Sequence, residues 1–146
     1  MKNIRRLAIA LIALIISTNS LADNAFSMVG TWKGLSNSTV KGSALHHEMN
    51  QNADKIRFVR TNFTLIVDAQ EGQNFAGYLV SADNKDKEVV LGSLNSNREG
   101  GVMVDIDGIY RFNVQSANQL EWCYAHAPES SNQHSGVAAC IEVTRQ

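Results

Sequence analysis

Imidazole and carboxylate side chains gather at one end of the predicted strands, where three long connections and the Asp107-Gly108 turn lie. The four histidines are His46, His47, His126 and His134, and Asp83, Asp86 and Asp107 lie in the same group of connections. Both side-chain types bind zinc and copper, and histidines change charge between about pH 5 and 8. Their spacing fits no known metal pattern, which favours polar loop residues that include histidine by chance. His46 and His47 are weak metal candidates, and no metal or cofactor is assigned.

Two sequences resemble catalytic or metal motifs but are incomplete. His47 begins a segment like that of zinc proteases, but Gln51 stands where the second histidine is required. Asp105-Ile106-Asp107-Gly108 resembles part of a calcium loop, whereas Met103 and Val114 occupy its first and last ligand positions. No Ser-His-Asp or Cys-His set can be assigned. The sequence therefore predicts no catalytic residue, and an enzyme is the least favoured class of function.

The two cysteines, Cys123 and Cys140, predict a disulfide, because an even count in a chain that begins with an export signal (described below) favours a bridge. If they face each other across an antiparallel pair, the apolar neighbours pair as Trp122 with Ile141, Tyr124 with Ala139 and Leu120 with Val143. Both apolar sets then fall on one side of the sheet, so the bridge and the burial pattern indicate the same register. Glu121 would face Glu142, a like-charge pair that costs a little on an exposed face.

Residues 1–22 have the features of an export signal. Lys2, Arg5 and Arg6 precede an apolar stretch over 7–16, which is short for a membrane span, and Ser20-Leu21-Ala22 ends in a small-x-small cleavage pattern. An uncleaved anchor is the alternative. We expect a periplasmic or secreted protein in which residues 23–146 form one domain with a real core.

Composition agrees with an exported sheet protein. Three of the 13 Lys and Arg residues lie before residue 23, so the remainder carries 10 against 14 Asp and Glu, a formal charge of −4. A mildly acidic chain without a basic stripe argues against binding to nucleic acid or to an anionic membrane surface. One proline and many short alternating runs are typical of β-structure.

Eight strands are predicted, and they follow one another without a domain boundary. Joined in sequence, eight short strands can close into an all-β, antiparallel up-and-down barrel, which removes both sheet edges. The expected strands are Met28–Val40, Ile56–Ala69, Phe75–Ser81, Glu88–Leu94, Val102–Ile106, Tyr110–Val114, Leu120–His126 and Val137–Arg145.

The hairpin over 62–81 has two possible registers. A two-residue Glu71-Gly72 turn would put Val67 opposite Ala76. A longer loop, with Ala69 opposite Phe75, instead brings the apolar side chains of both strands onto one face. We prefer the longer loop for that reason. A one-residue change of register moves a whole side-chain set to the other face. The face expected inside consists of Phe63, Leu65, Val67, Phe75, Gly77 and Leu79.

Asp107-Gly108 is a favoured hairpin dipeptide between the fifth and sixth strands. We expect Val102, Val104 and Ile106 to share one face with Tyr110, Phe112 and Val114. That arrangement needs an odd loop or a bulge, so the sequence predicts a local irregularity here.

Gly30-Thr31-Trp32 resembles the Gly-x-Trp start of lipocalins and avidins, where the tryptophan closes one barrel end. The resemblance implies a calycin-type barrel in which a basic residue of the last strand, here Arg145, packs over Trp32. The avidin biotin-site pattern is absent, so biotin binding is not implied. The chain also resembles uncharacterised exported bacterial envelope proteins through residues 30–34, His46-His47 and residues 70–77. No activity is implied by that second resemblance.

A small-ligand carrier or sensor is the first class of function considered. If the barrel is hollow, an apolar molecule would enter through its open end and contact the inward side chains. The alternative is that the aromatics simply fill the core, because an eight-stranded barrel is just wide enough for that. The expected lining is Phe63, Leu65, Leu79, Phe112, Trp122, Tyr124 and His126.

The second class is a periplasmic or surface interaction protein, for instance an inhibitor or an adhesion-related factor. It would bind a macromolecule through the long loops at one barrel end, which carry His46, His47, His134 and Asp107. The oligomeric state is not predicted. A transmembrane barrel is disfavoured, because charged residues occupy the face expected outside. Those residues are Asp105, Arg111, Glu121 and Glu142.

Overall fold

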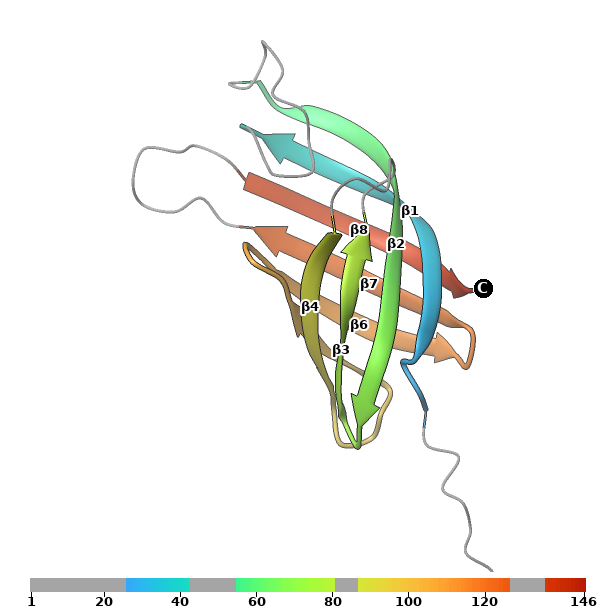
Figure 1. Ribbon diagram of the computed structural model, residues 1–146. Helices are drawn as coiled ribbons and strands as arrows, with labels where there is room; N and C mark the ends of the chain where they lie inside the picture. Colours follow the sequence, from blue (N-terminus) through green and yellow to red (C-terminus); the bar gives the residue numbers. More distant parts are fainter. Residues whose placement is uncertain (1–25, 43–54, 81–86, 127–135) are drawn as a thin grey trace, which may run out of the picture.

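The computed structural model describes residues 26–42, 55–80, 87–126 and 136–146, and the expected export signal lies outside these ranges. The described chain forms a closed antiparallel barrel in which each strand pairs with the next and β8 pairs with β1, as the sequence predicts (Figure 1). No helix among these residues is long and apolar enough to cross a membrane. The strands are β1 (Gly30–Lys41), β2 (Arg57–Glu71), β3 (Asn74–Val80), β4 (Lys87–Leu94), β5 (Gly100–Val104), β6 (Ile109–Ser116), β7 (Gln119–His126) and β8 (Gly136–Arg145).

The inward side chains form two apolar clusters. The larger fills the end of the barrel that contains Trp32 and includes Leu65, Phe112 and Trp122. The smaller joins Val40 to β8 near the other end, and Tyr124 contacts both clusters. Two serines of β1, Ser36 and Ser38, also face inward and are buried. The interior is therefore apolar at one end and mixed further along.

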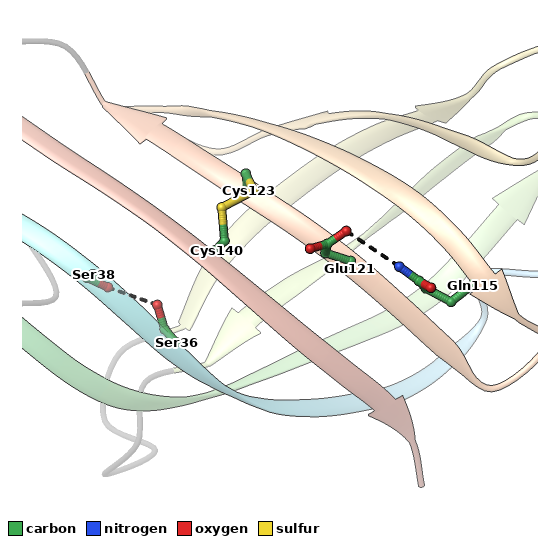
Figure 2. Close-up of a disulfide and its surroundings, with 6 residues drawn as sticks. All are labelled: Ser36, Ser38, Gln115, Glu121, Cys123 and Cys140. Atoms are coloured by element: carbon green, nitrogen blue, oxygen red, sulfur yellow. Dashed lines mark hydrogen bonds between the residues drawn. A yellow bond between two sulfur atoms is a disulfide. The ribbon is translucent and has the colours of Figure 1, made fainter.

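The hairpin of β7 and β8 has the predicted register throughout. Cys123 pairs with Cys140 at a Cα separation of 4.1 Å, and the two form the disulfide on the outer face (Figure 2). Trp122 faces Ile141 on the inner face, and Glu121 faces Glu142 outside, as expected. The Glu121 carboxylate accepts a hydrogen bond from Gln115 Nε2 at 3.4 Å. The register of this hairpin could be predicted because the cysteine pairing and the apolar pattern require the same alignment of β7 with β8.

The hairpin of β2 and β3 confirms the predicted face but not the predicted turn. Leu65 pairs with Leu79 and Val67 with Gly77, so the expected set points inward. The turn itself is tight, with Glu71 opposite Asn74, and Ala69 lies opposite Ala76 instead of Phe75. A bulge between Val67 and Ala69 supplies the one-residue shift that we had assigned to a longer loop.

The prediction for the hairpin of β5 and β6 is confirmed for Tyr110, Phe112 and Val114, which face inward, but it is wrong for β5 and for the turn. The register continues without a shift to the pair Val104–Ile109, so Met103 lies inside opposite Tyr110. Val102, Val104 and Ile106 are exposed instead of buried. The irregularity lies further along, between Val114 and Ser116, in the pairing of β6 with β7. The error arose because both faces of β5 are apolar, so side-chain polarity could not choose between them.

Trp32 and Arg145 close one end of the barrel together. Trp32 is fully buried, and its Nε1 donates a hydrogen bond to Met28 O at 2.8 Å. The Arg145 guanidinium lies over the indole, with Cζ 4.2 Å from the ring centroid. It also donates to the carbonyl oxygens of Ser27, Val29 and, at 3.3 Å, Ala117. Partial burial lowers the pKa of Arg145 from its ordinary value. The expected contact between Arg145 and Trp32 is present. Through Arg145, the last strand also holds the segment that precedes β1 and the turn between β6 and β7.

We expect Arg145→Ala to lower the free energy of unfolding by about 2–3 kcal/mol, because it removes the indole contact and leaves several carbonyls without their donor. Arg145→Lys should restore only part of this loss, since an ammonium lacks the planar fork of donors. Urea unfolding followed by tryptophan fluorescence measures both. An unchanged midpoint and emission maximum for Arg145→Ala would contradict this role.

Gly77 is required by a close approach of two strands beside the β2 bulge. A Cβ at this position would lie 2.0 Å from Ile66 O and 2.8 Å from Val67 Cα, and both are backbone atoms. We expect Gly77→Ala to lower the free energy of unfolding by about 2–3 kcal/mol.

Gly72 offers the matched control for this substitution. Its φ is +59°, and nothing lies within 4 Å of an added Cβ. Gly72→Ala should therefore cost only about 1 kcal/mol, from the left-handed conformation alone. Equal losses for the two variants in chemical denaturation would show that the steric explanation for Gly77 is wrong.

Candidate functional site

Two tyrosines and two aspartates meet at the end of the barrel opposite Trp32. Tyr110 and Tyr124 pair across β6 and β7, with ring centroids 4.6 Å apart. The Tyr110 hydroxyl donates to Asp105 Oδ2, and the Tyr124 hydroxyl donates to Asp107 Oδ1 at 2.7 Å. The turn after β5 thus supplies a carboxylate to each ring. Asp105, which we expected on the outer face, is instead directed to an inward tyrosine, and that prediction is wrong.

The turn holds its carboxylates in place through its own backbone. Asp105 Oδ1 accepts hydrogen bonds from Asp107 N at 3.2 Å and from Gly108 N at 2.7 Å. Short polar side chains commonly stabilise turns in this way. His126, at the end of β7, places Nδ1 2.5 Å from Asp107 O and 4.0 Å from Asp107 Oδ2. The sequence assigned Asp107 and His126 to the same barrel end, and the structure brings them into contact.

The electrostatics of this end keep both tyrosines protonated. Burial raises the pKa of Tyr110 far above its ordinary value of 10.0, and the hydrogen bond to Asp105 raises it further. Burial also raises the pKa of Tyr124, followed by its hydrogen bond to Asp107. A phenolate beside a carboxylate would be a like-charge pair in a poorly solvated place. Both hydroxyls are therefore donors under all ordinary conditions.

Three carboxylates approach one another here. Ligand oxygens of Glu88, Asp105 and Asp107 all lie within 4.8 Å of one another. Oxygen ligands of this kind suit hard cations such as Ca²⁺ or Mg²⁺. Glu88 Oε1 accepts a hydrogen bond from Ile106 N at 3.3 Å, and the two aspartates accept from the tyrosines. The histidines named as metal candidates, His46 and His47, lie outside the described residues, as do His134, Asp83 and Asp86.

The wall formed by β7, β8, β1 and β2 carries hydrogen-bond donors that face inward. Trp122 is 1% exposed, and its Nε1 has no hydrogen-bond partner. Arg57 Nε is likewise buried and unpaired, although Arg57 Nη2 donates to Gly42 O at 2.5 Å. On β1, the hydroxyls of Ser36 and Ser38 lie 2.8 Å apart and are hydrogen-bonded to each other (Figure 2).

Strand register arranges these donors in adjacent rows across the wall. Trp122 and Ser36 both flank Ile141, and the next row runs from Tyr124 through Ala139 to Ser38. The row after that runs from His126 through two valines to Arg57. Buried polar groups are normally hydrogen-bonded, and each exception calls for an explanation. We name the inward side chains of these three rows the donor wall: Trp122, Ser36, Tyr124, Ser38, His126 and Arg57.

All seven residues predicted to line a ligand chamber lie on inward positions of their strands. Four of them, Leu65, Leu79, Phe112 and Trp122, are packed in the larger core cluster. Phe63 and Tyr124 are partly buried against that cluster, and His126 is part of the polar end. Sequence analysis did not identify Ser36, Ser38, Arg57 or Glu88 as site residues. The inward alternation of β1 could have identified the serines, whereas nothing in the sequence indicates an unpaired indole.

A shallow hollow of about 400 Å³ lies on the outside of the barrel, where no site was predicted. It extends over β1, β2, β7 and β8 beside the disulfide, and Figure 2 shows Cys140 and Glu121 in this region. Its charges have both signs and are accessible to solvent. The lining residues are Leu35, Asn37, Arg60, Glu121, Cys140, Ile141 and Glu142.

No known protein family matches the sequence, and no curated protein matches it. Among solved structures, the S-type phycobiliprotein lyase CPES from Guillardia theta matches at 10% identity, over 82% of this chain and 88% of that one, with a TM-score of 0.30. A TM-score of this value does not establish a shared fold, so nothing about this protein is inferred from that lyase. The class of the protein follows instead from the closed eight-stranded meander, which is the architecture of lipocalins and streptavidin. The predicted eight-stranded antiparallel barrel is thus confirmed, while the resemblances to lipocalins and avidins and to exported envelope proteins stay predictions.

The raised tyrosine pKa values predict a loss of stability in alkali. Below about pH 10, tyrosine is protonated in both the folded and the unfolded chain, so the hydrogen bonds contribute fully. Above that pH, unfolded tyrosines ionise while folded Tyr110 and Tyr124 remain protonated. The free energy of unfolding should therefore fall as pH rises, by up to about 1.4 kcal/mol per pH unit for each tyrosine.

Phenylalanine variants test this assignment. Tyr110→Phe should be less stable than the parent at pH 7, by about 1–3 kcal/mol, because Asp105 loses a hydrogen bond. Its stability should fall less steeply between pH 10 and 11 than that of the parent. Urea unfolding at a series of pH values gives both quantities. An identical alkaline slope in Tyr110→Phe would contradict the assignment.

Proposed function

We propose that the barrel binds a small organic molecule that has an apolar body and at least one hydrogen-bond acceptor, and that it serves as a carrier or sensor of that molecule. The observation that carries the proposal is the buried indole N–H of Trp122, which has no partner. A buried donor left unpaired costs about 1–3 kcal/mol, so a ligand oxygen that accepts this hydrogen bond gains correspondingly. The apolar ligand expected from the sequence is thereby refined to an amphipathic one.

The donor wall favours an acidic ligand over a neutral one. Arg57 is a cation whose Nε is buried and unpaired, and it lies two rows from Trp122 along the same wall. Hydrogen bonds with a charged partner are stronger than neutral ones. The apolar surface beside these donors, from Ala139, Val137 and Val40, suits a hydrocarbon or aromatic body. A carboxylate or sulfonate on an apolar body therefore fits best.

Export remains part of the proposal. A disulfide on the outer face is typical of proteins that fold in an oxidising compartment, which supports the proposal that the protein resides in the periplasm or outside the cell. The alternative function, macromolecule binding through long loops, depends on segments that lie mostly outside the described residues. No described observation favours it over ligand binding.

Anilinonaphthalene sulfonate is a suitable probe, because it combines apolar rings with a sulfonate. We expect it to bind with a fluorescence increase and to quench tryptophan emission. Trp122→Phe keeps an aromatic ring but removes the N–H, and should weaken binding about tenfold, the effect of one buried hydrogen bond. Arg57→Met keeps a long apolar chain without the charge and should weaken it at least as much.

The probe could also adhere to exposed apolar surface, so an outer-face variant is needed as a control. Val104→Lys alters an exposed position on β5, away from the donor wall, and should leave the affinity of the quenching site unchanged. Native mass spectrometry of protein purified from its own host would show an acidic ligand directly. Equal probe affinity in the parent, Trp122→Phe and Arg57→Met would refute the proposal.

A further inference from the structure

The outer face of the barrel carries a continuous apolar area over β4, β5 and β6. We name it the apolar belt: Val89, Leu91, Val102, Val104, Ile106 and Ile109. Leu91 and Ile109 are each 56% exposed, and Ile106 in the β5–β6 turn is 78% exposed. Leu91, Val104 and Ile109 are direct neighbours, because they occupy one row of paired residues on adjacent strands. That row continues as Ala76 on β3 and Ala125 on β7, so it carries no charge over five strands.

Strands β4 and β5 each contain a segment that is apolar on both faces. Val89-Val90-Leu91 and Val102-Met103-Val104 are unbroken apolar runs, in which only Val90 and Met103 point into the core. Continuous runs of this kind are typical of strands covered on both sides, whereas a sheet with one wet face alternates. The β7–β8 hairpin does alternate, with Glu121 and Glu142 outside. The outer face of β4 and β5 therefore has the pattern of a covered surface, and that of the β7–β8 hairpin does not.

We propose that the apolar belt is the interface between two copies of this chain, packed side by side. The six side chains expose roughly 500 Å² of apolar surface, at the upper end of patches found on monomers. Two belts in contact would bury roughly 1,000 Å² together, and a polar rim brings the total to the 1,200–2,000 Å² of stable interfaces. The inference does not depend on ligand binding.

A second copy fits this surface better than other partners for two reasons. The row that runs through Leu91, Val104 and Ile109 is paired from strand to strand, so no strand edge within this row is free to pair with a foreign peptide, and contact must be made face to face. A two-fold interface also brings the same residues of both copies close together. Charged residues would repel one another there, whereas this row is uncharged. Two described cations, Lys87 and Arg111, lie beside the row and not in it, since Arg111 pairs with Val102 and Lys87 lies over Tyr78.

Sedimentation equilibrium of the purified protein over a wide concentration range tests the inference. We expect the parent to have twice the chain mass. Val104→Lys places a charge at the centre of the interface and should raise the dissociation constant about 100-fold or more. The matched control is Thr39→Lys, an exposed position on β1, which lies four strands from β5 around the ring. This control should leave the dimer intact.

Circular dichroism and tryptophan emission would show that each variant is folded, and Leu91→Gln replaces Val104→Lys if the latter is not. A parent that is monomeric at every concentration would overturn the inference. So would a dimer with the same dissociation constant in the parent and in both belt variants, since it would form elsewhere. A monomer that binds neutral phosphatidylcholine vesicles through Val104 would identify a lipid surface as the occupant instead.

Discussion

Closure of the strand ring is the constraint on which the rest of the structure depends. Each strand pairs on both sides, so the inward face of one strand determines the inward face of its neighbours. The pair Cys123–Cys140 lies outside, which turns Trp122 inward. Phe112 lies opposite Trp122, and Gly101 lies opposite Phe112. Met103 must then face the core and Val104 the surface, whatever their hydrophobicity.

This propagation explains which parts of the fold could be predicted from the sequence. The number and order of the strands, the disulfide register and the inner face of β2 and β3 were predictable, because alternation and turn residues are local signals. The orientation of β5 was not, since Val102, Met103 and Val104 are all apolar. It depends on the partners of the strand, starting from Trp122. The bulges at Val67 and Val114 were also missed, because no residue type marks them.

The candidate site was predictable only in part, for a similar reason. Asp107 and His126 could be assigned to one barrel end, because connections alternate between the ends of a meander. Glu88 reaches the same place from β4, and that convergence exists only in three dimensions. An unpaired donor is harder still to predict. Trp122 satisfies the apolar pattern of its strand, and only the complete set of neighbours shows that its N–H has no acceptor.

Polar and apolar side chains are distributed differently on the inner and outer faces of the barrel wall. This distribution determines which surface a ligand and a second copy of the chain would each contact. The donor wall lies over β7, β8, β1 and β2, and the outside of that side is charged. The outer side chains of β4 and β5, together with Ile109 of β6, are mostly apolar, and the carboxylates lie at the inward end of these strands. A partner packed on the apolar belt would contact the barrel from the side, where strands present their faces. The side chains of the belt point outward and those of the donor wall point inward, although Ile106 brings one edge of the belt to the β5–β6 turn. Binding inside the barrel and pairing through its outer face can therefore occur in the same molecule without competing for one surface.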